Sequence, residues 1–548
     1  MDREVVVEFR GITKYFKGIC ANKNINISLY KGEILSILGE NGSGKTTLMN
    51  MLSGIYQPDE GEIYINGEKA SIYSPKDAIE YGVGMVHQHF KLVDVFTAAE
   101  NIILGLKDKV SLKDAYLKLN EIASKYGFDI DLKKKVHNMS VSEKQTVEII
   151  KVLYRNASIL ILDEPTAVLT PQEADKLFAI IKRMKADGKS IILITHKLAE
   201  VLTVSDRVAI LRKGEYIKTL DTINTNEREL TEYMVGAKVD LKLERLRILA
   251  SPPVLEIRGL NVKKDDNTMA IKDLNFYLRG GQILGVAGIA GSGQKELCEA
   301  IVGLRHYHGL ITHKGISIAG YSVEKIKEIG ITMSFIPEDR LGLGLAPNLS
   351  ITDNLLLKTY KNKKGIFVDR KQARKEANEL IERYGVVTPS TETPVKNLSG
   401  GNIQKILVGR EIGANPNVII TAYPVRGLDI NSSYMIYDIL NEEKAKNTAI
   451  LFVGEDLDVL LTFCDKIMVL CEGKCMGIVH TKNTTKEEIG MMMTGAKNKI
   501  EENPEKAQGF APDSLLTDKE WKKLAKEKAK NDKKTSWTFV YNSKTYIY

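Results

Sequence analysis

The sequence has no long hydrophobic run and no secretory signal. None of its apolar stretches approaches the roughly 18 to 20 residues that a helix needs to cross a bilayer. Its opening segment, MDREVVVEFRGITKYF, has no apolar signal-peptide core. These absences predict a protein that is made and kept in the cytosol.

Cysteine is scarce as well. The chain has five cysteines, an odd and scattered set: Cys20, Cys298, Cys464, Cys471 and Cys475. Without a secretory signal, such a set favours reduced thiols over disulfides. Cys471, Cys475 and His480 have the chemistry of metal ligands, but IMVLCEGKCMGIVHT is explained more simply as a strand, a turn and a strand.

Charge is plentiful and its excess is positive. The net charge is +8, with 27% charged and 43% hydrophobic residues, which is ordinary for a soluble globular protein. Segment 518–534 alone holds eight lysines and favours a solvated helix or disordered extension over a polyanion-binding arm. Because basic residues elsewhere are not interleaved with aromatics, we expect no nucleic-acid partner.

The chain repeats itself. Residues 30–54 and 278–303 share one plan of a glycine turn, an apolar strand, a glycine-rich loop and a helix. Residues 138–153 match 397–412 in the same way. One offset of 259 positions (399 minus 140) separates three matching pairs: Ser140 and Ser399, Asp163 and Ala422, and His196 and Glu455.

Two copies of one domain are therefore predicted, at residues 1–240 and 252–496. Residues 241–251 form a short linker that runs into a Pro-Pro pair, and residues 497–548 form a Lys-rich tail of unknown role. In each copy apolar strands alternate with helical patterns. This predicts an α/β fold with a mostly parallel sheet.

The first copy contains a complete phosphate-binding loop. GENGSGKT follows the apolar strand 34–38 and opens a helix. Backbone N–H groups would cradle a β-phosphate, Lys45 would neutralise phosphate oxygens, and the Thr46 hydroxyl would ligate Mg²⁺. An ordinary strand-to-helix turn needs neither side chain. The candidate binding residues are Gly39, Asn41, Gly42, Ser43, Gly44, Lys45, Thr46 and Thr47.

Two later strands bring acids and a histidine to the same region. SILILDEPT delivers Asp163 and Glu164 at the carboxyl end of a buried strand, where open α/β sheets build their sites. Asp163 would hold Mg²⁺ and Glu164 would act as general base, since adjacent buried acids without a metal or substrate face a desolvation cost. His196 ends the strand IILITH and would contact a γ-phosphate.

The motif order GENGSGKT, VHQHF, MSVSEK, ILILDEPT and ITH resembles the nucleotide-binding domain of ATP-binding cassette (ABC) proteins, twice over, across about residues 4–496. The resemblance implies ATP and Mg²⁺ as ligands. It also implies that each copy has a RecA-like α/β core, a small antiparallel β part and a helical subdomain. By the same resemblance, Gln88 is a catalytic glutamine that senses Mg²⁺ and the membrane partner. Phe16 is either the aromatic that stacks on adenine or a core residue.

In this family two domains meet head to tail, so that each ATP lies between one phosphate loop and the other domain's LSGGQ-type signature. The intact loop would face the signature LSGGN, with contact residues Ser399, Gly400, Gly401 and Asn402. The opposite site is degenerate, with Gln294, Lys295, Ala422, Tyr423 and Glu455 in place of the functional residues and Ser142 in the facing signature. Its loop GIAGSGQKEL is either retained for architecture or still binds nucleotide without hydrolysis.

Fused tandem cassettes with a degenerate second half resemble the ATPase subunits of bacterial importers for nucleosides and simple sugars, and the motif details are closest to the nucleoside branch. The resemblance implies two integral-membrane permease subunits, an extracellular substrate-binding lipoprotein and a peripheral position on the cytoplasmic side of the cell membrane. The halves would form an intramolecular sandwich, and grooves beside Gln88 and Glu338 would be docking points.

Two other function classes remain as alternatives. Tandem ABC ATPases of the ribosome or of DNA repair have no membrane partners, but the ribosomal kind keeps both sites and has a long charged linker. A nucleotide-binding regulator without turnover would not need Lys45, Asp163, Glu164 and His196 together. Three departures from the family pattern are Ser142 in the first signature, Thr146 in place of a basic residue, and the unmatched tail.

Overall fold

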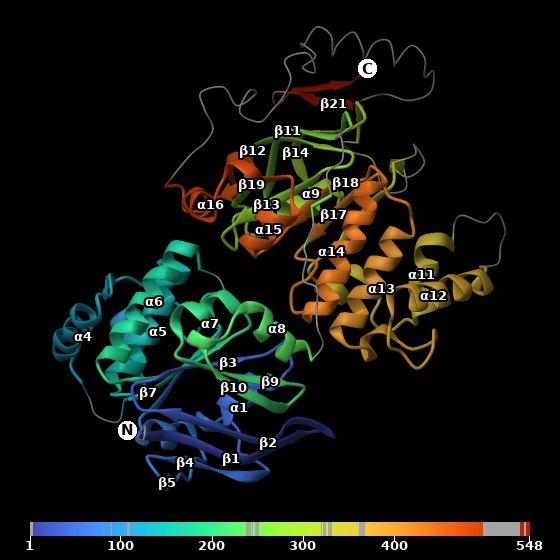
Figure 1. The fold of residues 1–548 in the computed structure, drawn as a ribbon. Coiled ribbons are helices and arrows are strands. Elements are labelled where there is room, and N and C mark those ends of the chain that lie inside the picture. Colours follow the sequence, from blue (N-terminus) through green and yellow to red (C-terminus); the bar gives the residue numbers. More distant parts are fainter. Residues whose placement is uncertain are drawn as a thin grey trace. The chain divides into compact units, whose positions relative to one another are not determined.

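Two units with the same strand order make up the chain. In the computed structural model, residues 1–240 form unit 1 and residues 241–548 form unit 2 (Figure 1). The residues that the structure describes are 4–88, 90–106, 110–167, 169–236, 243, 245–246, 251–318, 321, 325–326, 331–360 and 368–496, together with the backbone of 538–541 and 544–547.

Unit 1 is built on a ten-stranded sheet in the order β5-β4-β1-β2-β10-β9-β3-β8-β7-β6. Strands β6, β7, β8, β3 and β9 run parallel. They are short, almost entirely apolar runs, as strands covered on both faces are. The strands are β1 (Val5–Phe16), β2 (Ile19–Tyr30), β3 (Ile34–Leu38), β4 (Glu60–Ile65), β5 (Glu68–Lys69), β6 (Val83–Val86), β7 (Ile159–Asp163), β8 (Ser190–Thr195), β9 (Arg207–Arg212) and β10 (Glu215–Asp221).

Some helices of unit 1 pack against this sheet, and three form a helical subdomain. Helices α3, α4 and α5 contact one another and make that subdomain. Three of the helices begin with a capping box, in which a Ser or Thr and a Glu three residues later satisfy free backbone N–H groups. The helices are α1 (Lys45–Leu52), α2 (Pro75–Glu80), α3 (Ala98–Ile103), α4 (Leu112–Tyr126), α5 (Val141–Tyr154), α6 (Pro171–Ala186), α7 (Leu198–Val204) and α8 (Glu227–Val235).

Unit 2 repeats the plan with two sheets, and a separate two-stranded sheet, β21 (Thr538–Tyr541) and β22 (Lys544–Ile547), lies near its end. Its six-stranded sheet, β16-β17-β18-β13-β19-β20, has the strand order of β6-β7-β8-β3-β9-β10, and its four-stranded sheet, β12-β11-β14-β15, that of β2-β1-β4-β5. The strands are β11 (Pro253–Lys263), β12 (Met269–Arg279), β13 (Ile283–Gly288), β14 (Tyr307–His313), β15 (Ile316–Ser317), β16 (Met333–Ile336), β17 (Val418–Ala422), β18 (Ala449–Val453), β19 (Lys466–Cys471) and β20 (Lys474–His480).

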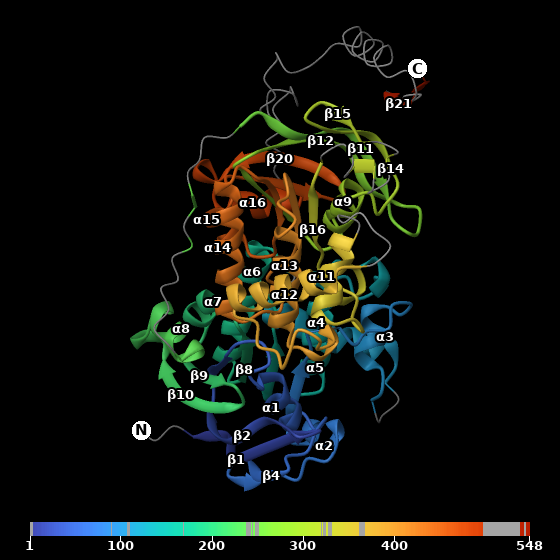
Figure 2. The same cartoon turned by 90° about the vertical axis from the view of Figure 1, so that its right-hand side faces the viewer.

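Helix α13 joins the helical subdomain of unit 2 to the rest of the unit. It contacts α11 and α12 on one side and α14 on the other (Figure 2). The helices are α9 (Gln294–Ile301), α11 (Ile351–Thr359), α12 (Arg370–Tyr384), α13 (Gly400–Ile412), α14 (Ile430–Ala445), α15 (Leu457–Phe463) and α16 (Lys486–Met493). A π-helical turn, η3 (Arg340–Gly344), follows β16.

The tandem α/β fold, with an antiparallel part and a helical subdomain in each copy, is thus confirmed. The bounds given to the linker and tail stay predictions, since 518–534 and most of 241–251 lie outside the described residues. The strand, turn and strand predicted around Cys471 and Cys475 are β19 and β20, and all five cysteines are free thiols. No helix in the described part of the chain is long and apolar enough to cross a bilayer.

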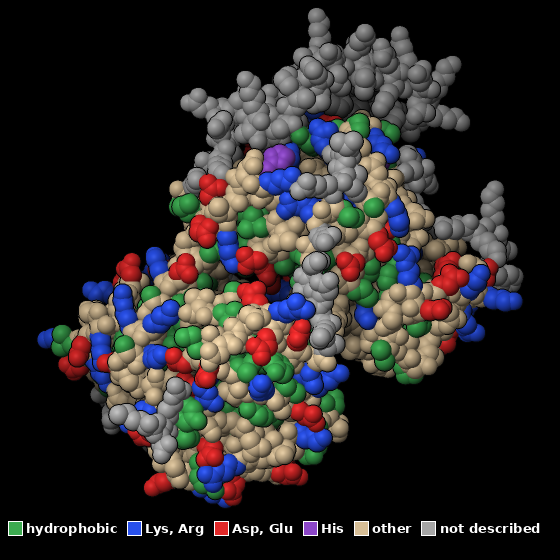
Figure 3. Space-filling view, viewed as in Figure 1, with side chains coloured by type: hydrophobic (Ala, Val, Ile, Leu, Met, Phe, Trp, Pro, Cys, Tyr) green, Lys and Arg blue, Asp and Glu red, His purple; other side chains and the backbone are tan. Residues whose placement is uncertain are grey.

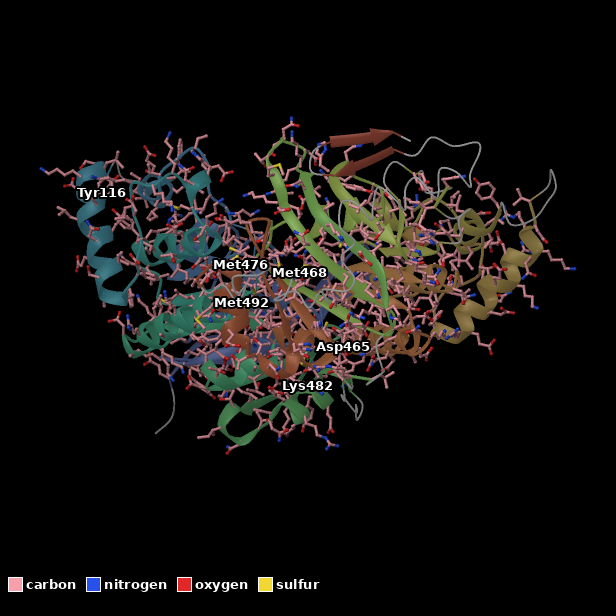
Figure 4. All side chains as sticks on the ribbon, turned by 90° about the horizontal axis from the view of Figure 1, so that it is seen from above. Tyr116, Asp465, Met468, Met476, Lys482 and Met492 are labelled. Atoms are coloured by element: carbon pink, nitrogen blue, oxygen red, sulfur yellow. The ribbon has the colours of Figure 1, made fainter. Side chains whose placement is uncertain are left out.

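Both faces of the unit 2 sheet are packed with apolar side chains. Met492 of α16 belongs to one apolar cluster, against which the partly buried Met476 of β20 packs, and Met468 of β19 belongs to the cluster on the other face (Figure 4). Outside these clusters, acidic and basic side chains are interspersed over the visible surface of each unit (Figure 3).

One buried ion pair fixes the edge of the unit 2 core. Lys444 of α14 is fully buried and its Nζ lies 2.8 Å from Oδ1 of Asp465, which is labelled in Figure 4. The other carboxylate oxygen of Asp465 accepts from the backbone N–H of Ile283 at 2.8 Å. In unit 1 the matching pair, Lys185 and Asp206, is about one-third exposed at both side chains.

We expect Lys444→Met to lower the free energy of local unfolding of unit 2 by about 2 kcal/mol, because it leaves Asp465 with an unpaired, partly buried charge. Lys185→Met, the matched change in unit 1, should cost less than about 1 kcal/mol because that pair is solvated. Hydrogen exchange of peptides from β13 and β19 measures the first, and of peptides from β3 and β9 the second. Equal losses of unfolding free energy in the two variants would contradict the expectation that burial of the ion pair decides the cost.

Candidate functional site

The phosphate-binding loop of unit 1, residues 39–46, is held in shape by close backbone packing. Gly42 and Gly44 have φ values of 79° and 94°, in the left-handed region that favours glycine. A Cβ on Gly44 would lie 2.4 Å from the carbonyl oxygen of Ala21, and one on Gly39 would lie 2.3 Å from that of Leu211. The loop therefore requires glycine where it touches β2 and β9.

Lys45 lies over this loop with its charge almost out of water. The side chain is 5% exposed, and its Nζ donates to the carbonyl oxygens of Gly39 at 2.7 Å and Glu40 at 2.8 Å. Burial lowers the pKa of Lys45, and the neighbouring carboxylates of Glu164 and Asp163 oppose that shift. A desolvated ammonium group beside a nest of backbone N–H groups is a site for a phosphate-like anion.

The loop also contains an unsatisfied buried hydroxyl. Ser43 is 3% exposed and its Oγ has no hydrogen-bond partner. Buried polar groups are rarely left without a partner, so each exception needs an explanation. A ligand oxygen bound within the loop would supply the missing partner, and this fits a phosphate group. Asn41 and Gly42 lie exposed at the tip of the loop, and Thr47 is partly buried behind it.

The predicted metal ligands meet at the start of α1. Oγ1 of Thr46 lies 3.4 Å from Oδ1 of Asp163, and Asp163 is 3% exposed at the end of β7. A hydroxyl beside a buried carboxylate is the set of oxygen ligands that Mg²⁺ accepts together with phosphates and water. The two residues fit the ion on these grounds.

Glu164 is the centre of a hydrogen-bonded cluster with Gln88 and His196, which we call the Glu164 cluster. Nε2 of Gln88 donates to Oε2 of Glu164 at 2.9 Å, and Nδ1 of His196 lies 2.9 Å from Oε1. Glu164 has a φ of 46°, and its N–H donates to the carbonyl oxygen of Ile194 on β8 at 3.0 Å. A non-glycine residue in this conformation is a common feature of functional sites.

The cluster keeps the Glu164 carboxylate ionised. Burial would raise its pKa, but the hydrogen bond and charge of His196, with the charges of Lys45 and Lys197, outweigh burial, so the pKa lies below its ordinary value. Glu164 is therefore in the ionised form that a general base requires, while the same contacts lower its basicity. Gln88, Glu164 and His196, predicted from three separate motifs, thus come together.

Phe16 does not lie in the core. Its ring is 37% exposed and packs edge-on against Tyr56, with the centroids 5.1 Å apart. Of the two interpretations open from sequence, core packing is therefore wrong. Stacking on adenine stays a prediction.

The second signature lies at the start of α13 in unit 2. Ser399 caps this helix by accepting from the N–H of Asn402 at 3.4 Å, and the Asn402 side chain donates to the same hydroxyl at 3.0 Å. Gly400 and Gly401 form the first turn, where a Cβ would lie 3.3 Å from Arg340 and 3.2 Å from Ser432 respectively. That this signature completes the unit 1 site stays a prediction.

The degenerate site of unit 2 keeps the backbone of its counterpart. Gln294 is 3% exposed and donates to the carbonyl oxygen of Ile289 at 3.1 Å, while Lys295 is exposed beside Glu299. Tyr423 has a φ of 50° and its N–H donates to Val453 at 2.9 Å, as Glu164 does to Ile194. Ala422 is buried without a carboxylate. Unit 2 therefore keeps the backbone of the loop and of the strand ends, but it lacks the charged side chains that Lys45, Asp163 and Glu164 provide in unit 1.

Three residues around these sites have contacts that the sequence did not reveal. Gln145 donates to the carbonyl oxygen of Pro165 at 2.6 Å and ties α5 to the residue after Glu164. In unit 2, Arg340 donates to the carbonyl oxygens of Gly400 on α13 and of Arg426, and the Arg426 guanidinium pairs with Glu338. The replacement of two neutral residues by Glu338 and Glu455 was a signal for a nearby cation.

A cavity lies beside Gln88 in unit 1. It has a volume of about 180 Å³ and lies between α2, β6 and α5. Its wall combines apolar side chains such as Ile79 and Val152 with the charged groups of Lys91, Glu148 and Arg155. It borders the segment that carries Gln88, through His87.

Comparison with known proteins identifies the family. A model described as "ABC transporter" matches residues 22–167 and again residues 271–424. The guanosine import ATP-binding protein NupO of Bacillus subtilis is 44% identical over 505 residues, covering 90% of this chain and 98% of that protein. The nucleoside import ATP-binding protein NupA of Lactococcus lactis is 41% identical, covering 90% and 99%. The glucose import ATP-binding protein TsgD13 of Haloferax volcanii is 38% identical, covering 90% and 96%.

The double match has the same order as the two strand-and-helix repeats, and the first match ends just beyond Asp163 and Glu164. With one family domain in each unit, and relatives that align over nearly their whole length, the chain belongs to the ABC transporter family in its tandem form.

Proposed function

We propose that this chain is the ATP-hydrolysing subunit of an ABC importer, with a single working site based on unit 1. The observation that carries the proposal is the Glu164 cluster beside Lys45, Thr46 and Asp163. Unit 2 has the same backbone at the matching positions but Gln294, Ala422 and Tyr423 as side chains. One unit therefore holds a full set of groups for hydrolysis.

Each group of unit 1 has a role that follows from its surroundings. Lys45 and the backbone N–H groups of the loop bind phosphate oxygens. Thr46 and Asp163 would hold Mg²⁺, which when bound neutralises charge on the β- and γ-phosphates. The ionised Glu164 carboxylate accepts the proton of the attacking water, and His196 and Gln88 orient that carboxylate through its two oxygens.

The signature of unit 2 is proposed to complete this site. The N–H groups at the start of α13 and the Ser399 hydroxyl would face the γ-phosphate bound by the loop of unit 1. A helix N-terminus suits that role because its free N–H groups and dipole favour an anion. Closing the halves on ATP and separating them after hydrolysis would drive the membrane partners.

The solute and partners are proposed from the relatives. Proteins named for import of guanosine and of nucleosides are 44% and 41% identical to this chain, against 38% for one named for glucose import. We therefore favour a nucleoside, carried by two permease subunits with an external binding protein, on the cytoplasmic side of the cell membrane. The cavity beside Gln88 offers a docking place for a permease segment that combines apolar and acidic residues.

Glu164→Gln should abolish ATP turnover by the transporter reconstituted with its permeases, because the amide cannot accept the proton; a loss of at least about 100-fold is expected. Tyr423→Phe, at the matching position of unit 2, should retain turnover. Phosphate release measures both. Turnover that survives in Glu164→Gln would show that the working site is elsewhere.

Gly44→Ala should raise the Kd for ATP at least about tenfold, because its Cβ would meet the Ala21 carbonyl and shift the N–H groups of the loop. Gly32→Ala is the matched control: its φ is also positive, at 65°, but nothing lies within 4 Å of its Cβ. Titration with a fluorescent ATP analogue gives both values. Equal affinities would count against the loop as the binding site.

One copy of this chain should be present in each transporter, because a single chain supplies both halves of the sandwich. The mass of the purified complex tests this. A complex that contains two copies would contradict the proposal.

A further inference from the structure

The degenerate site of unit 2 has an ordered set of ion pairs of its own. Glu338 and Glu455 occupy the positions that Gln88 and His196 occupy in unit 1. Two carboxylates that lie close together repel each other unless a cation lies between them. The guanidinium of Arg426 provides that cation: its Nη1 pairs with Glu338, and its Nε lies 3.1 Å from Oε1 of Glu455.

The arrangement inverts the charges of the Glu164 cluster. In unit 1 a carboxylate is held between an amide and an imidazole, whereas in unit 2 a guanidinium is held between two carboxylates. The residue that matches Arg426 in unit 1 is Ala167, at the offset of 259 positions (426 minus 167). The cation is therefore an addition specific to unit 2.

Arg426 is also linked to the signature of unit 2. Its backbone carbonyl accepts from Nη2 of Arg340, and Nη1 of Arg340 donates to the carbonyl oxygen of Gly400 at 3.5 Å. Gly400 is the first residue of α13, next to Ser399. A continuous chain of contacts thus runs from Glu455 to the start of the signature helix.

The same segment is fastened further along α13. Oγ of Ser334 donates to the carbonyl oxygen of Glu411 at 2.7 Å, and Arg410 donates to that of Gly344 at 2.6 Å. Both ends of the 334–344 segment are therefore tied to α13, with Glu338 and Arg340 between them.

Unit 1 ties its signature helix in a different way, and unit 2 has lost that tie. Gln145 of α5 donates to Pro165 at 2.6 Å. Its counterpart, Gln404, is completely buried, and neither its amide nitrogen nor its amide oxygen has a hydrogen-bond partner. The contacts of Arg340 and Arg426 take over the connection between the signature helix and the strand end.

We propose that Glu338, Arg340, Arg426 and Glu455 form a strut that positions the start of α13, and with it Ser399, without any nucleotide in unit 2. The inference rests on the proposed function, because the signature affects turnover only if it completes the site of unit 1. Arg340 and Arg426 are positioning residues: they act through the backbone of residues 399–402. The degenerate site then serves as a fixed support for the working site.

The side chains of the strut allow a clean test. Arg426, Glu338 and Glu455 are 50%, 40% and 46% exposed. Exposed ion pairs contribute little to stability, so variants at these positions should fold. Arg383 and Glu442 form a matched control pair in unit 2, 3.0 Å apart and 54% and 57% exposed, which is not connected to the strut by any contact described above.

In the full transporter, Arg426→Ala should lower kcat by about tenfold or more, since small misplacements of catalytic groups have large effects on rate. The Kd for ATP should stay within about twofold, because the loop of unit 1 is untouched. Arg383→Ala should change neither value. A loss of ATP affinity that equals the loss of kcat, or an equal effect of Arg383→Ala, would overturn the inference.

A charge exchange supplies the rescue. Arg426→Glu should lose more turnover than Arg426→Ala, since it places three carboxylates together. Adding Glu455→Arg to Arg426→Glu should restore part of kcat, which a merely destabilising change would not show. No recovery in the double variant would overturn the strut.

Ser399→Ala separates failure of this inference from failure of the proposed function. If Ser399→Ala keeps full turnover, the signature does not complete the site and the proposed function fails. If Ser399→Ala loses turnover while Arg426→Ala matches the unchanged chain, the composite site stands and the strut is overturned. Loss of turnover in both variants, with an unchanged Kd for ATP, supports both the composite site and the strut.

Discussion

The parallel core of each unit brings the ends of distant segments to one edge of a sheet. In unit 1, strands β3, β8 and β7 are neighbours, so the phosphate loop, His196 and the acids Asp163 and Glu164 lie together although they are far apart in sequence. The charges gathered there are largely desolvated, and each is held by neighbours rather than by water. The site depends on this constraint, because a buried ammonium and buried carboxylates are tolerated only when they are paired or bind a ligand.

Unit 2 shows that this arrangement of strand ends does not depend on the presence of the phosphate lysine and the acids. Its strand order and the left-handed backbone at Tyr423 match those of unit 1, while the phosphate lysine and the acids are gone. What remains is the helix that carries Ser399 and a set of ion pairs around Arg426. Under the proposed strut, unit 2 keeps its fold because it holds the start of α13 in place, although it lacks the phosphate lysine and the acids.

The sequence was enough to predict the tandem fold because the signals were local. Glycine spacing and apolar runs specify strand, loop and helix from neighbouring residues, and the offset of 259 positions shows that this pattern occurs twice. The meeting of Glu164 and His196 followed from the rule that parallel strands end at one edge. The contacts of Arg426 could not be predicted, because Glu338 lies 88 residues away and only the folded loops bring them together. Whether Phe16 is exposed could likewise not be decided from the sequence, because an aromatic residue at a strand end can lie either in the core or at the surface.

We propose that, of the two phosphate-loop sites, only the one in unit 1 is hydrolytic. Trapping the transporter with vanadate and radiolabelled ATP, then counting bound ADP for each chain and mapping it by photo-crosslinking, tests this directly. The account predicts one trapped ADP, attached to the peptide that contains Lys45. Two trapped ADP molecules, or a label on the peptide that contains Gln294, would contradict it.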